Sequence, residues 1–210
     1  AIRALRGLLL DLGHPLTPEN AQHLGRLPKL EDLGLWGTDC RDDALAELPP
    51  TLTSLKLFTL RGVSEQGMAE LDKRLRLRCF GLCVAPPPAV VPTVAALFAV
   101  SPIERYDSPT LPDDAMVAAL AGVPTLKRLT VVDGQRRLPE LLGPLSRLTK
   151  LEMLHVHAAM TERPQQLTPL RGHPALRRIV FQLNQEPSRR PGEAELAALR
   201  DAAGCDVEVR

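Results

Sequence analysis

The sequence is poor in aromatic residues and has no long apolar segment. Phe, Trp and Tyr make up 3% of its 210 residues, and there is a single Trp. Aliphatic side chains must therefore form the core. No run of 18 consecutive apolar residues and no recognisable signal peptide occurs, so we expect no membrane-spanning segment.

An excess of one charge is also missing, and cysteine is scarce. Lys and Arg number 26 and Asp and Glu number 25, which gives a net charge of +1. This balance provides no general attraction to nucleic acids or anionic lipids, so we do not expect a nucleic-acid partner. Of the four cysteines, Cys79 and Cys83 stand four apart on one predicted strand. That spacing is about 13 Å, too far for a disulfide, and we predict a reducing, cytoplasmic location.

The chain lacks the glycine-rich motifs that bind phosphate groups. Neither GxxxxGK[ST] nor GxGxxG occurs, and both motifs place backbone N–H groups around a phosphate. The carboxylate pairs Asp42–Asp43 and Asp113–Asp114 stand at predicted helix starts, where they suit the positive end of the helix dipole. We therefore predict no active site, no enzymatic activity and no cofactor.

What the sequence does contain is a short phrase, apolar-x-x-apolar-x-apolar, repeated about every 25 residues. Its copies begin at Leu5, Leu30, Leu52, Leu77, Ile103, Leu126, Leu151 and Leu176. With Tyr106 counted as apolar, Ser108 is the only polar residue at the apolar places. A repeat of this length is typical of a solenoid, in which each unit packs on its neighbours.

The segments between the copies predict helices. Helix-forming runs occupy residues 41–48, 64–71, 92–99, 112–122, 139–145 and 192–200. Proline stands two residues before the phrase at Pro28, Pro50, Pro124 and Pro174. Because proline lacks an N–H donor and disfavours helical geometry in the preceding residue, it ends a helix before each of these four copies. We predict a strand, turn, helix, turn unit, with residues 86–88 as a stiff turn and 185–192 as a surface loop.

This pattern resembles the leucine-rich repeat family over nearly the whole chain, and most of all its intracellular, helix-containing classes (ribonuclease-inhibitor-like and GALA-like). The resemblance implies a single α/β domain over residues 1–210. It would be a solenoid, or horseshoe, of about eight repeats, with a parallel sheet on the concave face and helices on the convex face. The family usually has Asn at the ninth place of the repeat, where it ties the turns together. Only Asn184 fits, and Thr38 is a candidate substitute, so we expect irregular turns.

The two ends of the chain are unequal. Residues 204–209 predict a ninth, closing strand with Val207 and Val209 at the apolar places. At the other end the phrase already begins at Leu5, with no capping segment before it. An uncovered first repeat would expose apolar surface and a strand edge. We therefore expect this chain to be the C-terminal part of a larger protein, with further domains N-terminal to residue 1.

The variable places of the phrase predict the binding surface. Alternation along a strand puts the third, fifth and seventh places on the concave face, and neighbouring strands stack them into columns about 4.8 Å apart. Trp36 and Phe58 are neighbours in the seventh column, and Lys56 and Asp107 stand in the fifth. Large rings at exposed positions are typical of binding hot spots. The alternative is that loops at the rim cover them.

Basic side chains occupy the same face. Arg105, Arg128 and Arg178 form a broken third column that could meet an acidic peptide or a phosphate, unless nearby acids neutralise them. His155 and His157 point to one side of their strand, a geometry that some zinc sites use. The neighbouring strands offer no third ligand, so we predict no metal; the pair could contact a partner or respond to pH.

The resemblance implies a non-enzymatic module that recognises a protein or peptide ligand on the concave face. The candidate binding residues are Trp36, Phe58, Lys56, Arg105, Asp107, Arg128, His155, His157 and Arg178. Family members often follow a nucleotide-switch domain of the NACHT or STAND type, which would make this chain the sensor or regulatory end of such a protein. The alternative is an adaptor or effector domain that selects a substrate, as GALA-like proteins do.

Overall fold

A computed structural model gives the fold of this chain. It describes residues 4–84, 94, 97–98, 101–108, 114–133, 142–143, 145–158, 164–182 and 191–210. Four predicted features lie wholly or partly outside these residues. They are the turn at 86–88, most of the helix at 92–99, the start of the helix at 139–145 and most of the loop at 185–192. The chain divides into two compact units, Ala1–Asp107 and Ser108–Arg210, and each is described by itself.

Among the described residues, nine parallel strands follow one another in chain order from β1 to β9. Their bounds in the first unit are β1 Gly7–Asp11, β2 Asp32–Trp36, β3 Ser54–Leu57, β4 Cys79–Leu82 and β5 Arg105–Asp107; in the second they are β6 Arg128–Asp133, β7 Met153–Ala158, β8 Arg178–Gln182 and β9 Asp206–Val209. Each copy of the phrase contributes one strand, and the predicted closing strand is β9. The predicted α/β repeat fold with a parallel sheet is confirmed.

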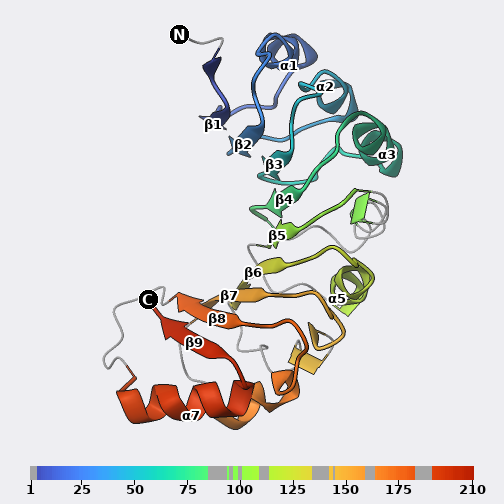
Figure 1. The fold of residues 1–210 in the computed structure, drawn as a ribbon. Helices are drawn as coiled ribbons and strands as arrows, with labels where there is room; N and C mark the ends of the chain where they lie inside the picture. The colour runs from blue at the N-terminus through green and yellow to red at the C-terminus, as the bar shows by residue number, and fades with distance from the viewer. Residues whose placement is uncertain are drawn as a thin grey trace. The chain divides into compact units, whose positions relative to one another are not determined.

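Helices alternate with the strands. They are α1 Pro18–Gly25, α2 Asp42–Ala46, α3 Glu65–Arg74, α5 Asp114–Ala121, the 3-10 helix η3 Pro164–Leu170 and α7 Glu193–Ala203. Side-chain caps start two of them, because Thr17 accepts the N–H of Asn20 and Ser64 accepts the N–H of Gly67. In the first unit α1, α2 and α3 lie side by side on one side of their strands (Figure 1).

The apolar places of the phrase form the core. Leu30, Leu33 and Leu35 of the second copy are fully buried, and the equivalent leucines of the third copy are at most 1% exposed. Their side chains point away from the variable places because successive residues of a strand alternate. The polar exception Ser108 is also buried, and its backbone N–H donates to the carbonyl of Thr130 at 2.8 Å.

The first copy of the phrase is packed less completely than the others. Leu8 and Leu10 of β1 are half-buried, whereas their row partners Leu33 and Leu35 are inaccessible. At the other end Val207 of β9 is fully buried, and Gly204 ends α7 in the left-handed conformation at φ 69°.

At one turn, the residue at the ninth place of the repeat forms the expected side-chain hydrogen bond to a neighbouring turn. Thr38 is buried, and its hydroxyl donates to the backbone carbonyl of His14 in the preceding repeat. The N–H of Leu16 donates to the carbonyl of Asp39 at 3.0 Å beside it. Thr38 thus links two successive turns, the role that Asn plays in the family that the sequence resembles.

Candidate binding surface on the sheet

The register of the sheet places the variable residues in rows. Side chains at the third, fifth and seventh places of the strands form a surface that we call the open face. Leu9 pairs with Gly34, Gly34 with Lys56, and Lys56 with Gly81. The predicted columns therefore match the register of the paired strands within each unit.

An apolar patch lies on the open face of the first unit. Leu9 is 67% exposed and Trp36 is 44% exposed. Gly34, between them, is buried beneath the Leu9 side chain: a Cβ at Gly34 would stand 2.5 Å from Leu9 Cδ1 and 3.7 Å from Trp36 Nε1. Phe58, directly after β3, is half-buried. We call Leu9, Gly34, Trp36 and Phe58 the Trp36 patch.

A group of three charged side chains lies farther along the same face. The Asp107 carboxylate accepts two hydrogen bonds from Arg105, through Nε and Nη2, each at 3.0 Å. Its Oδ2 also lies 2.7 Å from Nζ of Lys56. Lys56 on β3 reaches Asp107 on β5 across Gly81 of β4, where a Cβ would stand 3.2 Å from Lys56 Cγ. The glycine therefore permits an ion pair between strands that are not neighbours.

These contacts change the electrostatics of the group. Burial by itself would raise the pKa of the Asp107 carboxyl, but the hydrogen bonds and charges of Arg105 and Lys56 outweigh it and lower that pKa. The hydrogen bonds to Asp107 in turn raise the pKa of the Arg105 guanidinium. Arg105 is thus already neutralised by an acid, which was the alternative to anion binding.

Two thiols flank the charged group. Cys79 and Cys83 are half-buried on either side of Gly81 and form no disulfide. Burial raises the pKa of both thiols, so the reactive thiolate is scarce at neutral pH. Neither thiol has the features of an activated nucleophile.

In the second unit the histidine pair lies on the open face. The rings of His155 and His157 are 4.7 Å apart between centroids and tilted by 32°. Thr130 of β6 and Val180 of β8 are the row neighbours of His155. Val180 is only 3% exposed although it occupies a variable place, so the expectation that this place faces solvent is wrong for β8.

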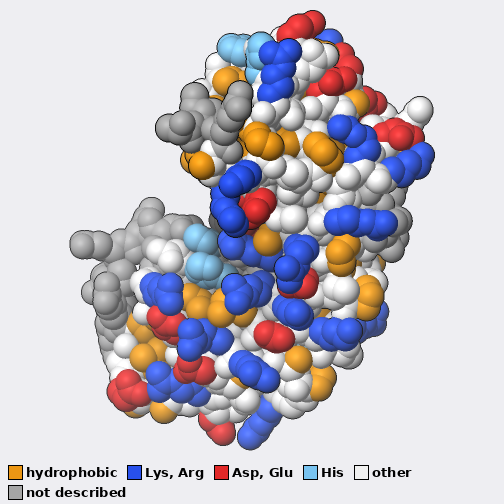
Figure 2. All heavy atoms as spheres, turned by 45° about the horizontal axis from the view of Figure 1, so that its top comes forward, with side chains coloured by type: hydrophobic (Ala, Val, Ile, Leu, Met, Phe, Trp, Pro, Cys, Tyr) orange, Lys and Arg blue, Asp and Glu red, His pale blue; other side chains and the backbone are white. Residues whose placement is uncertain are grey.

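The two candidate arginines of the second unit, Arg128 and Arg178, differ in their partners. Arg178 forms ion pairs with two acids of β9: its Nε lies 3.4 Å from Oδ2 of Asp206, and its Nη1 lies 3.9 Å from Oε2 of Glu208. Arg128 is exposed and forms no ion pair with the described residues. Figure 2 shows acidic side chains scattered among the Lys and Arg side chains of the face in view. Arg128 is therefore the basic side chain of this column that an acidic ligand could pair with.

The side chains that commonly bind metal ions are dispersed over the described part of the chain. There, no group of three or more His, Cys, Asp or Glu side chains is arranged to hold a metal ion. Among the same residues no helix combines the length and the apolar character needed to cross a bilayer.

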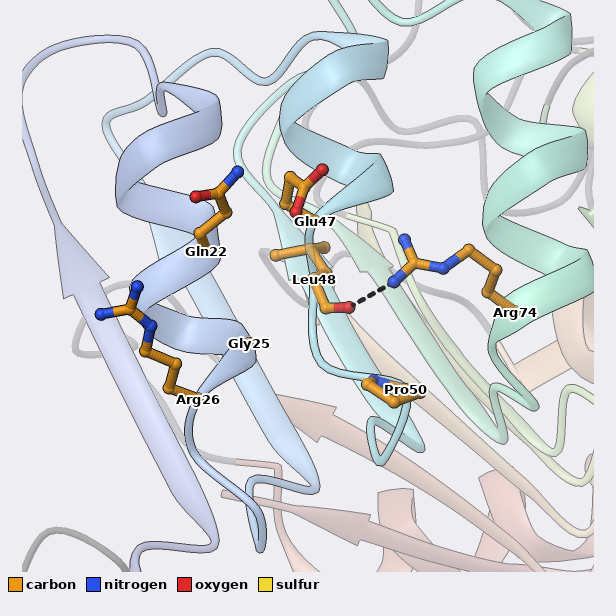
Figure 3. Close-up of a pocket in the computed structure, with 7 residues that line it drawn as sticks. All are labelled: Gln22, Gly25, Arg26, Glu47, Leu48, Pro50 and Arg74. Atoms are coloured by element: carbon orange, nitrogen blue, oxygen red, sulfur yellow. Dashed lines mark hydrogen bonds between the residues drawn. The ribbon is translucent and has the colours of Figure 1, made fainter.

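A pocket of about 340 Å³ opens on the helix side of the first unit (Figure 3). It is lined by Gln22, Gly25, Arg26, Glu47, Leu48, Pro50 and Arg74. Nη2 of Arg74 donates to the carbonyl of Leu48 at 3.1 Å, and a Cβ at Gly25 would stand 3.0 Å from the carbonyl oxygen of Glu47. These contacts join successive repeats, so the pocket lies where neighbouring repeats pack together.

The sequence did not predict one member of the binding surface. Leu9 was not among the candidate residues, yet its side chain is the most exposed large apolar one in the described chain. Its place in the phrase was the available signal, because an apolar residue at a variable fifth place faces away from the core.

Comparisons with known proteins bear on the fold. No family model and no curated protein matches this sequence. Among solved structures the chain is similar to internalin C2 of Listeria monocytogenes, with 17% identity over 98% of this chain and 80% of that one and a TM-score of 0.51. Internalin F of the same bacterium also matches, with 13% identity over 100% and 61% of the two chains and a TM-score of 0.41, too low to carry weight.

Internalins are leucine-rich repeat proteins. At 17% identity the likeness to internalin C2 concerns the fold alone. Together with the repeated phrase and the parallel sheet, it confirms that this chain has the leucine-rich repeat fold that the sequence resembles.

Proposed function

We propose that this chain is a non-enzymatic recognition module that binds a protein or peptide on the open face of its sheet. The observation that carries the proposal is the exposure of Trp36 and Leu9 on that face. A large ring held on a strand offers much contact area at a small entropic cost, which is typical of binding hot spots. Phe58 extends this surface, and Lys56, Arg105 and Asp107 form its polar border.

The second unit contributes a different kind of contact. Four candidate residues lie at variable places of β6, β7 and β8: Arg128, His155, His157 and Arg178. We assign them polar contacts to the same class of ligand. Because Asp107 holds Arg105 and the acids of β9 hold Arg178, this surface lacks the unbroken basic stripe that nucleic-acid binding needs.

The wider role follows by analogy with the family. We infer that the module serves as the sensor or regulatory part of a larger cytoplasmic protein, for example one with a NACHT or STAND nucleotide switch. The alternative is a GALA-like adaptor that selects a substrate. Four unpaired thiols agree with a reducing compartment. The domain content of the full-length protein decides between the two, since a P-loop domain favours the first and an F-box the second.

The proposal is tested with peptides selected from a random displayed library on the immobilised chain. Affinities of the selected peptides are then measured by calorimetry for the wild type and for Trp36→Ala and Phe58→Ala. We expect each variant to lose at least about tenfold in affinity, the effect of losing a hot-spot side chain. Arg26→Ala, on the helix side, is the control and should bind as the wild type does.

Stability must be measured beside affinity. Since Trp36 is 44% exposed, truncation should cost about 1 kcal/mol or less, far below the value for a buried ring. A library that yields no binder, or binders that tolerate Trp36→Ala and Phe58→Ala, would contradict the proposed function.

A further inference from the structure

The charges around the Trp36 patch are predominantly negative. On the open face of β1, β2 and β3 the ionisable residues are Asp11, Asp32 and Lys56. Asp11 is the row partner of Trp36, and its carboxylate lies against Gly37, the residue after Trp36: a Cβ there would stand 2.5 Å from Asp11 Oδ1. Asp32 begins the same strand as Trp36 and accepts a hydrogen bond from the Ser54 hydroxyl at 2.9 Å.

The one cation of these three strands does not neutralise the two acids. Lys56 leans across Gly81 and lies 2.7 Å from Asp107, on the side away from β1. Neither Asp11 nor Asp32 forms an ion pair with any residue that the structure describes. Arg105 of β5 attracts Asp32 electrostatically without forming an ion pair with it. The patch therefore combines exposed apolar surface with two carboxylates that are in no ion pair with the described residues.

The indole itself adds an attraction for positive charge. An exposed indole can hold a Lys ammonium or an Arg guanidinium, a contact that contributes at solvent-exposed sites as well as buried ones. Asp11 in the neighbouring strand is about 4.8 Å away along the sheet, so one cationic side chain could touch both the ring and the carboxylate. Leu9, beside it, offers contact to an apolar side chain of the same ligand.

We propose that the partner of the Trp36 patch is a basic peptide segment, in which a Lys or Arg side chain alternates with an apolar one. One cation would lie on Trp36 beside Asp11, a second would reach Asp32 at the other end of β2, and the apolar side chain between them would cover Leu9. This inference rests on the proposed function and adds the chemistry of the ligand.

Three matched peptides test the inference. The probe is acetylated, amidated Leu-Ser-Lys-Ser-Leu-Ser-Lys, whose Leu and Lys side chains point to one side when the peptide is extended. In the two comparison peptides Gln or Glu replaces each Lys. Because the chain has one Trp, the emission of Trp36 reports contact with the patch directly. We expect the Lys peptide to bind at least about tenfold more tightly than the Glu peptide at low salt, with the Gln peptide between them.

Two substitutions locate the charge. Asp11→Asn and Asp32→Asn should each weaken the Lys peptide about two- to fivefold, the range for exposed charge pairs, and should leave the Gln peptide unchanged. Asp201→Asn changes the net charge equally but lies on α7, and it should have no effect. Salt at 1 M should remove most of the advantage of the Lys peptide, because the Debye length is then about 3 Å.

The outcomes separate the two proposals. Because Trp36→Ala leaves the chain without a Trp, the affinities of this variant are measured by calorimetry. Equal affinity for all three peptides, with loss on Trp36→Ala, overturns the basic preference and leaves the recognition surface standing. Tighter binding of the Glu peptide overturns it as well. Binding of all three that survives Trp36→Ala counts against both proposals. If none of the peptides binds, the inferred ligand chemistry is wrong, and the library selection tests the proposed function on its own.

Discussion

Asp107 on β5 is joined to β3 through Lys56 and is bonded by Arg105 of its own strand, and its replacement by Ala is the sharpest test of this arrangement. The change removes two hydrogen bonds of 3.0 Å from Arg105 and an ion pair of 2.7 Å with Lys56. Truncating one partner of a buried pair costs about 3–5 kcal/mol, and an exposed pair contributes about 0.2–1 kcal/mol. Asp107 is 17% exposed, but its partners are 36% and 43% exposed and can turn to water. We therefore expect a loss of about 1.5–3 kcal/mol at pH 7.

The pH dependence of this loss has a definite sign. Burial acts to raise the pKa of Asp107, yet Arg105 and Lys56 lower it below its ordinary value of 3.8. A carboxyl whose pKa is lower in the folded state stabilises the protein above its unfolded pKa. That stabilisation is lost as the pH falls from 3.8 through the folded pKa. The difference in unfolding free energy between wild type and Asp107→Ala should therefore shrink in acid.

Urea unfolding followed by Trp36 emission measures this difference in the first unit, because the chain has no other Trp. Asp201→Ala is the control. Asp201 is 80% exposed, and its Oδ1 lies 3.6 Å from Nη2 of Arg171, so this is an exposed ion pair. Its loss should change stability by less than about 0.5 kcal/mol. A loss below about 0.5 kcal/mol for Asp107→Ala at pH 7 would refute the stabilising role of the charged group. A loss that stays the same at pH 2 would refute its dependence on the ionised carboxylate.

Other changes test the packing of single residues. Gly37→Ala should cost more than about 1 kcal/mol because Gly37 has φ 63°. Gly143→Ala should be neutral or stabilising, because a Cβ added at Gly143 meets open space. Thermal melts compare the two variants. Thr38→Val removes the hydroxyl that holds the carbonyl of His14, and urea midpoints should show a loss of about 1–2 kcal/mol at unchanged slope. Phe80→Ala empties a site that is 1% exposed, and chemical unfolding should show a loss of about 3–5 kcal/mol.

The framework of the fold could be predicted from the sequence because it depends on two regular spacings, the repeat of about 25 residues and the two-residue alternation along each strand. The repeat sets the position of each strand, and alternation along the strand decides which side chains enter the core. Leu33 and Leu55 are therefore buried row partners, and Gly34 and Lys56 are row partners on the other face. A strand slipped by one residue would have exchanged these faces.

The contacts within the binding surface could not be predicted in the same way. A long side chain can reach past its neighbouring strand, and Lys56 does so over Gly81 to meet Asp107. The acids that hold Arg178 come from β9, and the burial of Val180 depends on its surroundings rather than on its place in the phrase. Side-chain direction and reach decide these contacts, and neither is contained in the spacing of the repeat.

The measurement closest to the central claim is the emission of Trp36 as a library-selected peptide is added to the chain. Trp36 is partly exposed on the open face and is the only Trp. If a ligand covers it, the emission should shift to the blue, and the shift should be half complete at the dissociation constant found by calorimetry. If calorimetry reports binding while the emission stays constant, the ligand binds elsewhere and the assignment of the open face is wrong.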